Sequence, residues 1–398
     1  MVVREFLLPK RQVLYITAFD PWDRWTNSGV VPTICTRLQK MGLLYGAWNA
    51  HDSSFAELHG RSAMRHLMYR IRRKITKEHL KLRKAALPPA DERSGNLARL
   101  LSRVPHGTPV VYHYVLPIIN PVLPIRRFLF QDITIDDALK GGGFGYNSLS
   151  PELIAEHKKF QKSVITNADG VLSFAGFVAD SLEREYAYPR NKVFPIGAGA
   201  IRRWEGVTEP TRERYERKRI LFVGRAFERK GGDTLLEAFK SVRARVPDAT
   251  LTIVSSMAKF EVSEGIEHIP FASNEQLHDL YLNSSVFCMP TKCETWGLVF
   301  VEAASHGLPI VGFDDWALPD IVDSGTTGFL TSNRTPAGLA DALVDALSDP
   351  AGLHTMGKAA IARVRDVLEW PHVMDRFLHA VLPDELKGRR AVWMRPRV

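Results

Sequence analysis

The second half of the chain alternates short apolar runs with amphipathic stretches of helical length. The apolar runs lie at 220–224, 250–255, 286–290 and 309–313, and the helical stretches at 233–245, 274–283 and 297–306. Strands that are apolar throughout are buried on both faces, and helices between them supply the crossovers of a parallel sheet. The pattern predicts an α/β fold with a doubly wound parallel sheet. Asn274 is expected as the N-cap of the helix that it opens.

The first half predicts a second domain of the same kind. An apolar run at 13–17 precedes a loop at 20–29 and an amphipathic stretch that ends near Gly42. Strand-like runs follow at 109–115, 127–130 and 170–174. Residues 194–200 (FPIGAGA) contain the glycines and proline that are typical of a connection between domains. We therefore expect two Rossmann-like domains, at 1–200 and 201–370, that face each other across a cleft, followed by a helical tail at 371–398.

The net charge of +9 comes from one segment. Residues 61–84 hold ten Lys or Arg and one acidic residue, Glu78, and apolar residues recur there at helical spacing. A basic amphipathic helix of this kind can lie on an anionic membrane surface. It can equally pack on the first domain through its apolar stripe and expose its cations, and the two interpretations are compatible. The segment lacks interleaved aromatic residues beyond Tyr69, so we expect no nucleic acid as a partner.

Composition limits the compartment and the cofactors. Three cysteines are too few for a disulfide framework, and none has the spacing of a zinc site. No apolar window reaches the length of about 20 residues that a membrane span needs, and no signal sequence opens the chain. We expect a cytoplasmic protein, peripheral on the inner face of the plasma membrane, that uses no metal and requires no cofactor.

The segment 294–302 (ETWGLVFVE) is the strongest local signal. It leads from a predicted strand into a helix that begins near Gly297. Loops at this edge of a parallel sheet bind ligands, and the first N–H groups of a helix attract anions such as a diphosphate. Glu302 lies inside an apolar helix, where a buried carboxylate needs a partner such as ribose hydroxyls. Glu294 lies in the loop before it, free to reach a sugar.

A second anion site is indicated at 224–232 (GRAFERKGG). The predicted strand ends at Gly224, and Arg225 and Lys230 precede a helix that opens with glycines. Arginine can hold a phosphate with two hydrogen bonds, and lysine acts as a mobile point charge. By itself this pattern also fits a solvated loop. Its position in the same domain as the 294–302 segment favours the anion site.

These two segments, with 318–330 (LPDIVDSGTTGFL), resemble glycosyltransferase family 4, whose members are retaining enzymes of the GT-B architecture. The resemblance is dense from 219 to 330 and loose in the first half. It implies that Arg225 and Lys230 neutralise the diphosphate of a nucleotide-sugar donor and that Glu294 contacts the sugar. Gly224, Trp296, Gly297 and Leu298 would line the same site, and Glu302 would hold the ribose. It also implies that the last helices cross back to the first domain.

The acceptor side is less defined. The resemblance places Gly29 near the donor, although Gly29 also suits the start of a helix. Family members commonly have a histidine at the end of a central strand, where this chain offers either Asp132 or His113. The acceptor itself would be a glycan or a lipid-linked molecule. Two alternatives to a hexosyltransferase stay open: a sugar-nucleotide epimerase of the same architecture, and a non-catalytic protein that binds membranes or nucleic acids.

Overall fold

The computed structural model describes residues 12–17, 20–22, 26–49, 54–56, 97–113, 124–142, 146–202, 204 and 209–386. The predicted basic helix at 61–84 lies outside these residues. The chain divides into two compact units. The first comprises Met1–Gln131, Lys158–Leu172 and Leu378–Arg389, and the second comprises Asp132–His157, Ser173–Phe377 and Arg390–Val398.

The first sheet has seven strands in the order β3-β2-β1-β4-β5-β6-β7. The strands are β1 (Val13–Thr17), β2 (Leu44–Asn49), β3 (Ser54–Ala56), β4 (Pro109–His113), β5 (Arg126–Phe130), β6 (Gly170–Ser173) and β7 (Val193–Pro195). β1 pairs in parallel with β2 on one side and β4 on the other, whereas the edge strand β3 runs antiparallel to β2. β2 and β3 thus lie on one side of β1 and β4 to β7 on the other, so the strand order reverses at β1, as in a doubly wound sheet.

The main described helices that accompany this sheet have the expected amphipathic character. They are α1 (Val30–Lys40), α4 (Ile135–Lys140), α5 (Pro151–Thr166) and α6 (Phe177–Tyr186). α1 buries Val30, Ile34 and Leu38, which share one helical face, and Gly42 follows it with a φ of 71°. Because glycine adopts this conformation without strain, the predicted helix end at Gly42 agrees with the structure.

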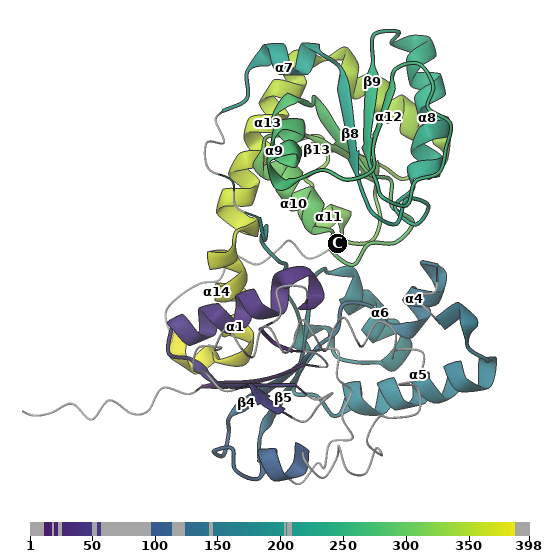
Figure 1. Ribbon diagram of the computed structural model, residues 1–398. Helices are drawn as coiled ribbons and strands as arrows, with labels where there is room; N and C mark the ends of the chain where they lie inside the picture. Colours follow the sequence, from purple (N-terminus) through teal and green to yellow (C-terminus); the bar gives the residue numbers. More distant parts are fainter. Residues whose placement is uncertain are drawn as a thin grey trace, which may run out of the picture. The chain divides into compact units, whose positions relative to one another are not determined.

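The second sheet has six strands in the order β10-β9-β8-β11-β12-β13. They are β8 (Arg219–Val223), β9 (Thr250–Val254), β10 (Ile266–Ile269), β11 (Val286–Cys288), β12 (Ile310–Phe313) and β13 (Gly328–Thr331). All of the neighbouring strands pair in parallel. Figure 1 shows α8 and α12 on one face of this sheet and α9, α10 and α13 on the other. Both sheets are therefore wound as the sequence predicts, and the fold class is confirmed.

Three helices of the second unit begin and end close to the predicted positions: α8 (Gly232–Arg245), α9 (Asn274–Asn283) and α10 (Leu298–Ser305). The same unit also contains α7 (Arg212–Glu216), α11 (Leu318–Ile321), α12 (Pro336–Ser348) and α13 (Pro350–Arg363). The predicted N-cap of α9 was wrong by one residue. Ser273 caps the helix, because its hydroxyl accepts a hydrogen bond from the Gln276 N–H while the Gln276 side chain accepts one from the Ser273 N–H.

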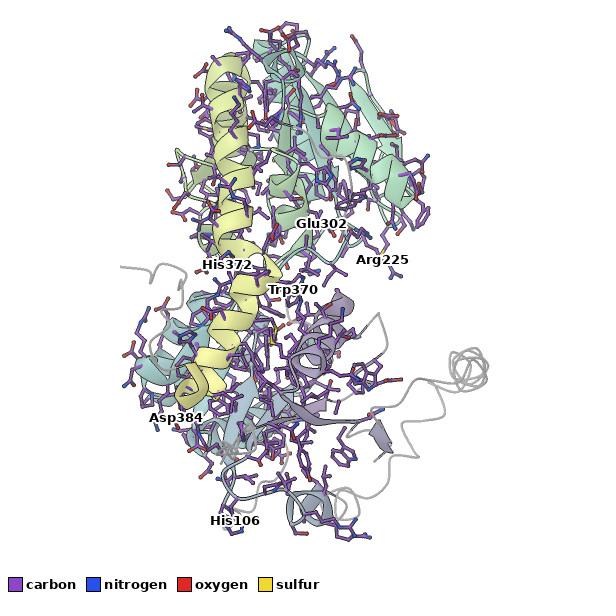
Figure 2. The ribbon with its side chains drawn as sticks, turned by 90° about the vertical axis from the view of Figure 1, so that its left-hand side faces the viewer. His106, Arg225, Glu302, Trp370, His372 and Asp384 are labelled. Atoms are coloured by element: carbon purple, nitrogen blue, oxygen red, sulfur yellow. The ribbon has the colours of Figure 1, made fainter. Side chains whose placement is uncertain are left out.

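A long helical run lies near the end of the described chain and is followed by a short 3-10 helix, η6 (Pro383–Leu386). α13 continues through a π-helical turn, η5 (Val364–Leu368), into α14 (Trp370–Val381). Figure 2 shows the run bending near Trp370, as expected where a wider turn interrupts the ladder of hydrogen bonds. Among all helices within the described ranges, none combines the length and the hydropathy needed to cross a bilayer.

Candidate functional site

The carboxyl ends of β8 and β11 form the switch point of the second sheet. β8 pairs with β9 on one side and with β11 on the other, so the chain leaves these neighbouring strands toward opposite faces. A crevice at such a point is where open α/β sheets bind ligands. The loop 224–231 follows β8 and the loop 289–297 follows β11. The two predicted anion segments therefore meet at one edge of one sheet.

Backbone contacts hold these two loops together. The Lys292 N–H donates to the Arg229 carbonyl at 3.0 Å, and the Arg229 guanidinium donates to the Cys293 carbonyl at 3.0 Å. Gly231 has a φ of 76°, and a Cβ at this position would lie 1.9 Å from the Pro290 carbonyl oxygen. Only glycine permits this approach of one loop to the other.

Both loops end at a helix N-terminus without a side-chain cap. α8 has Gly231 as its N-cap and α10 has Gly297, and neither helix receives a side-chain capping bond. Leu298 is the first residue of α10. Uncapped N–H groups and the positive ends of two helix dipoles attract anions. Gly224 is buried, whereas the Arg225 side chain is exposed and lies at the same end of the unit as Glu302 (Figure 2).

Lys230 and Glu294 join the two loops through an ion pair. The Lys230 ammonium donates a hydrogen bond to the Glu294 carboxylate, and the two side chains are only 14% and 8% exposed. The sequence suggested that Glu294 was free to reach a sugar. In the structure its carboxylate instead accepts from Lys230, 64 positions away in the chain, because burial of a charge requires a partner.

Glu302 is buried and paired, as its place in an apolar helix predicts. It is 3% exposed, and its Oε2 accepts from the Arg202 guanidinium at 3.1 Å and from the Tyr281 hydroxyl at 3.4 Å. Burial raises the pKa of the Glu302 carboxyl, and the nearby Arg202 opposes this effect. The carboxylate that the resemblance assigns to ribose is thus occupied by an arginine from the segment before β8.

Aromatic and imidazole rings lie around the ion pair of Arg202 and Glu302. Trp204 stacks on His278 with ring centroids 6.0 Å apart, and His278 Nδ1 lies 2.9 Å from His306 Nε2. Burial lowers the pKa of His306 to about 4, which keeps this imidazole neutral. An open pocket of about 490 Å³ lies beside these rings. Its lining residues are Ile201, Arg202, Trp204, Asn274, Glu275, His278 and Asp279.

Trp296 turns away from the edge formed by the two loops. Its side chain is 2% exposed, and the indole N–H donates to the Ala198 carbonyl at 2.8 Å. Its ring also lies near that of Phe174, at a centroid distance of 6.4 Å. The backbone of this residue remains in the 289–297 loop, while its side chain packs on the connection that follows β7.

The remaining predicted residues lie closer to the first sheet. Gly29 is the N-cap of α1, with a φ of 93°. His113 ends β4; it is fully buried, lies 2.6 Å from the Tyr15 hydroxyl and stacks on Phe130. Burial lowers the pKa of His113 to about 3. Asp132, two residues beyond β5, is also buried, at 7% exposure.

Sequence reasoning missed the partners of the predicted residues. Arg202 and Tyr281 were not singled out, although the expectation that Glu302 needs a partner called for residues of this kind. A cation near the domain connection and a tyrosine in the last turn of a predicted helix are common features of sequences. No spacing rule connects them to Glu302.

Comparison with known proteins gives a family match in the second half of the chain. Residues 208–363, which contain both loops, match the family model described as glycosyl transferases group 1. The chain is 29% identical over 238 residues to the D-inositol 3-phosphate glycosyltransferase of Streptomyces avermitilis, covering 53% of this chain and 51% of the relative. These matches support a glycosyltransferase.

Two further comparisons agree with this class. The chain is 30% identical over 199 residues to the GDP-mannose-dependent alpha-(1-6)-phosphatidylinositol monomannoside mannosyltransferase of Mycolicibacterium smegmatis, covering 45% of this chain and 51% of the relative. It thus spans about half the length of the curated relatives it matches. A glycosyltransferase structure from Rickettsia africae superposes with a TM-score of 0.65 at 14% identity, covering 96% of this chain and all of that one. This likeness supports the GT-B fold.

Proposed function

We propose that this protein is a retaining glycosyltransferase that moves a hexosyl unit from a nucleotide-diphosphate sugar to a glycan or lipid-linked acceptor. The observation that carries the proposal is the junction of two loops at the switch point of the second sheet. There two uncapped helix N-termini meet the Lys230–Glu294 ion pair. We assign donor binding to residues 201–370, the acceptor side to 1–200, and a bracing role to 371–398.

The donor diphosphate fits the positive features of this edge. The N–H groups that open α8 and α10 would bind its oxygens, and Arg225 and Lys230 would balance its charge. Gly224 and Gly297 would allow the diphosphate to approach the backbone. When the bond to the sugar breaks, negative charge grows on the departing diphosphate, and the fixed cations and dipoles stabilise it. This arrangement requires neither a metal ion nor another cofactor.

The carboxylates would recognise the sugar and the ribose. Glu294 would accept hydrogen bonds from hydroxyls of the transferred sugar while Lys230 keeps it ionised and oriented. Glu302 would accept bonds from the ribose hydroxyls, and Arg202 would have to yield one of its contacts to that carboxylate. The acceptor would attack from the same face that the diphosphate leaves, which gives retention without a protein nucleophile.

The acceptor proposal rests on charge and on relatives. The ten cations of residues 61–84 would attract an anionic membrane, at about 1 kcal/mol for each cation near the surface. The mannosyltransferase relative carries phosphatidylinositol monomannoside in its name, an acceptor that resides in membranes. A peripheral location on the inner face of the plasma membrane would bring the enzyme to such an acceptor. Gly29 and Asp132 would lie on this acceptor side.

The proposal is tested by a calorimetric binding panel of UDP, GDP, ADP and their common hexose conjugates. One nucleotide family should bind to the wild type. Glu302→Gln, which keeps the side-chain volume but removes the charge, should weaken binding at least about tenfold, since hydrogen bonds to charged groups contribute about 1.5–3 kcal/mol. Lys230→Ala should weaken it further.

A matched control is Glu237→Gln. Glu237 is exposed on α8 in the same unit, where it pairs with the exposed Lys240, and its substitution should leave nucleotide affinity unchanged. If the folded wild type binds no nucleotide diphosphate, the proposed function is wrong. If nucleotide binds but Glu302→Gln and Glu237→Gln behave alike, the donor site lies elsewhere.

A further inference from the structure

Residues 196–200 (IGAGA) are held by three large side chains that reach them from elsewhere in the second unit. Arg376 Nε donates to the Ile196 carbonyl at 2.9 Å, Trp296 Nε1 to the Ala198 carbonyl at 2.8 Å, and Trp370 Nε1 to the Ala200 carbonyl at 2.9 Å. The three donors therefore bind alternate carbonyls of one connecting segment.

The two glycines between these carbonyls make room for the rings. Gly197 has a φ of 70°, and a Cβ at this position would lie 3.1 Å from the Trp296 ring. A Cβ at Gly199 would lie 2.8 Å from the Trp370 ring. A larger residue at either position would push the segment away from the indole rings. The two glycines thus lie at the positions between the carbonyls that accept the three hydrogen bonds.

The three donor side chains are buried, and so are Ile196 and Ala198, whereas Ala200 is half-buried. Trp296, Trp370 and Arg376 are 2%, 3% and 0% exposed, and Ala198 is fully buried. A buried carbonyl that loses its donor has no water to replace it, so each bond costs more to remove than an exposed one. The three donors thus hold the segment in one conformation.

Trp296 differs from the other two donors in its place along the chain. It lies two residues after Glu294, which pairs with Lys230, and immediately before Gly297, the N-cap of α10. Trp370 and Arg376 belong to α14. The Trp296 bond therefore links the connecting segment directly to the loop that carries the proposed donor site.

We propose that Trp296 is a positioning residue for donor binding. Its indole N–H, fixed on the Ala198 carbonyl, sets the backbone of residues 294–297 so that Glu294 and the first N–H groups of α10 keep the geometry that the diphosphate requires. Trp296 thus acts on the donor through Glu294 and Gly297. This inference rests on the proposed function.

The test compares Trp296→Phe with Trp370→Phe. Each substitution keeps an aromatic ring and removes one indole N–H from the same segment, but only the first lies in the donor loop. Trp296→Phe should weaken the affinity for the nucleotide diphosphate that binds the wild type about five- to tenfold, the size of one ordinary hydrogen bond. It should raise the KM for the donor in the same proportion, while Trp370→Phe stays within twofold of the wild type.

Thermal unfolding separates positioning from general destabilisation. Both variants should lower Tm, Trp296→Phe by more, because the Ala198 carbonyl is buried whereas Ala200 is half-buried, and affinity is compared well below both Tm values. Equal effects of the two variants on affinity, or no effect of Trp296→Phe, would overturn the proposal while leaving the proposed function intact. Absence of nucleotide binding by the wild type would overturn both. If Trp296→Phe does not fold, 3-benzothienylalanine at position 296 retains the bicyclic shape without the N–H, and the same outcomes apply.

Discussion

Replacing Lys230 by methionine removes the partner of a buried carboxylate and keeps an unbranched side chain. The side chains of Lys230 and Glu294 are 14% and 8% exposed, so little water can take over the interaction. Breaking a buried pair from one side costs about 3–5 kcal/mol, because the other charge stays buried without compensation. The residual exposure of Lys230 places the expected loss near the lower end, at about 3 kcal/mol of unfolding free energy.

The double variant Lys230→Met/Glu294→Gln removes both charges and keeps both volumes. Replacing a whole buried pair by neutral groups is often close to neutral, so the double variant should lose only about 1 kcal/mol. A double-mutant cycle followed by urea unfolding should then give a coupling energy of at least about 2 kcal/mol. Because the double variant should remain folded while lacking both charged groups, a weaker nucleotide affinity of this variant would report the loss of donor contacts and not the loss of folding.

Two results would refute this reasoning. A loss below about 1 kcal/mol for Lys230→Met would mean that the pair behaves as an exposed ion pair. A double variant whose loss equals the sum of the two single losses would mean that the two side chains do not interact. In either case the ion pair could not join the two loops in the way that the proposed donor site requires.

Three further predictions concern local geometry and pH. Gly231→Ala places a Cβ at a positive φ and against Pro290, so urea unfolding should show a loss of about 3 kcal/mol or more. Gly325→Ala, at a φ of 81° with open space around it, should cost about 1–2 kcal/mol, and equal losses for the two variants would contradict the close approach of the loops. The buried His113 has a pKa of about 3, so unfolding takes up a proton below its ordinary pKa of 6.5. His113 should therefore contribute a loss of about 1.4 kcal/mol of stability per pH unit as the pH drops from 6.5 toward 3, and urea titrations of His113→Gln should show a slope that is shallower by this amount. The Asp320 carboxylate accepts a hydrogen bond from the N–H of Gly176, the N-cap of α6, at 2.9 Å. Thermal unfolding should show that Asp320→Ala lowers the unfolding free energy by about 1 kcal/mol and Asp320→Asn by less, and identical losses would exclude this hydrogen bond as the cause.

Local patterns in the sequence determined the second sheet and the positions of the two loops that follow β8 and β11. A strand that is buried on both faces is a run of consecutive apolar residues, which is visible in the sequence without knowledge of distant contacts. The glycines at 224, 231 and 297 mark the turns between strands and helices. Because the carboxyl ends of parallel strands share one edge, placing the motifs on that edge needed no coordinates. The burial of Glu302 followed in the same way from the apolar helix around it.

The tertiary structure alone decided which side chains pair across the chain. Lys230 and Glu294 are 64 positions apart, Arg202 and Glu302 are 100 apart, and Trp296 and Ala198 are 98 apart. Such pairs depend on how the strands are ordered and on which face each connection crosses, and neither propensity nor periodicity contains that information. The same limit explains Trp296, which the family resemblance placed in the lining of the donor site. Burial of its large ring was instead satisfied by a glycine-rich segment that only the folded chain brings beside it.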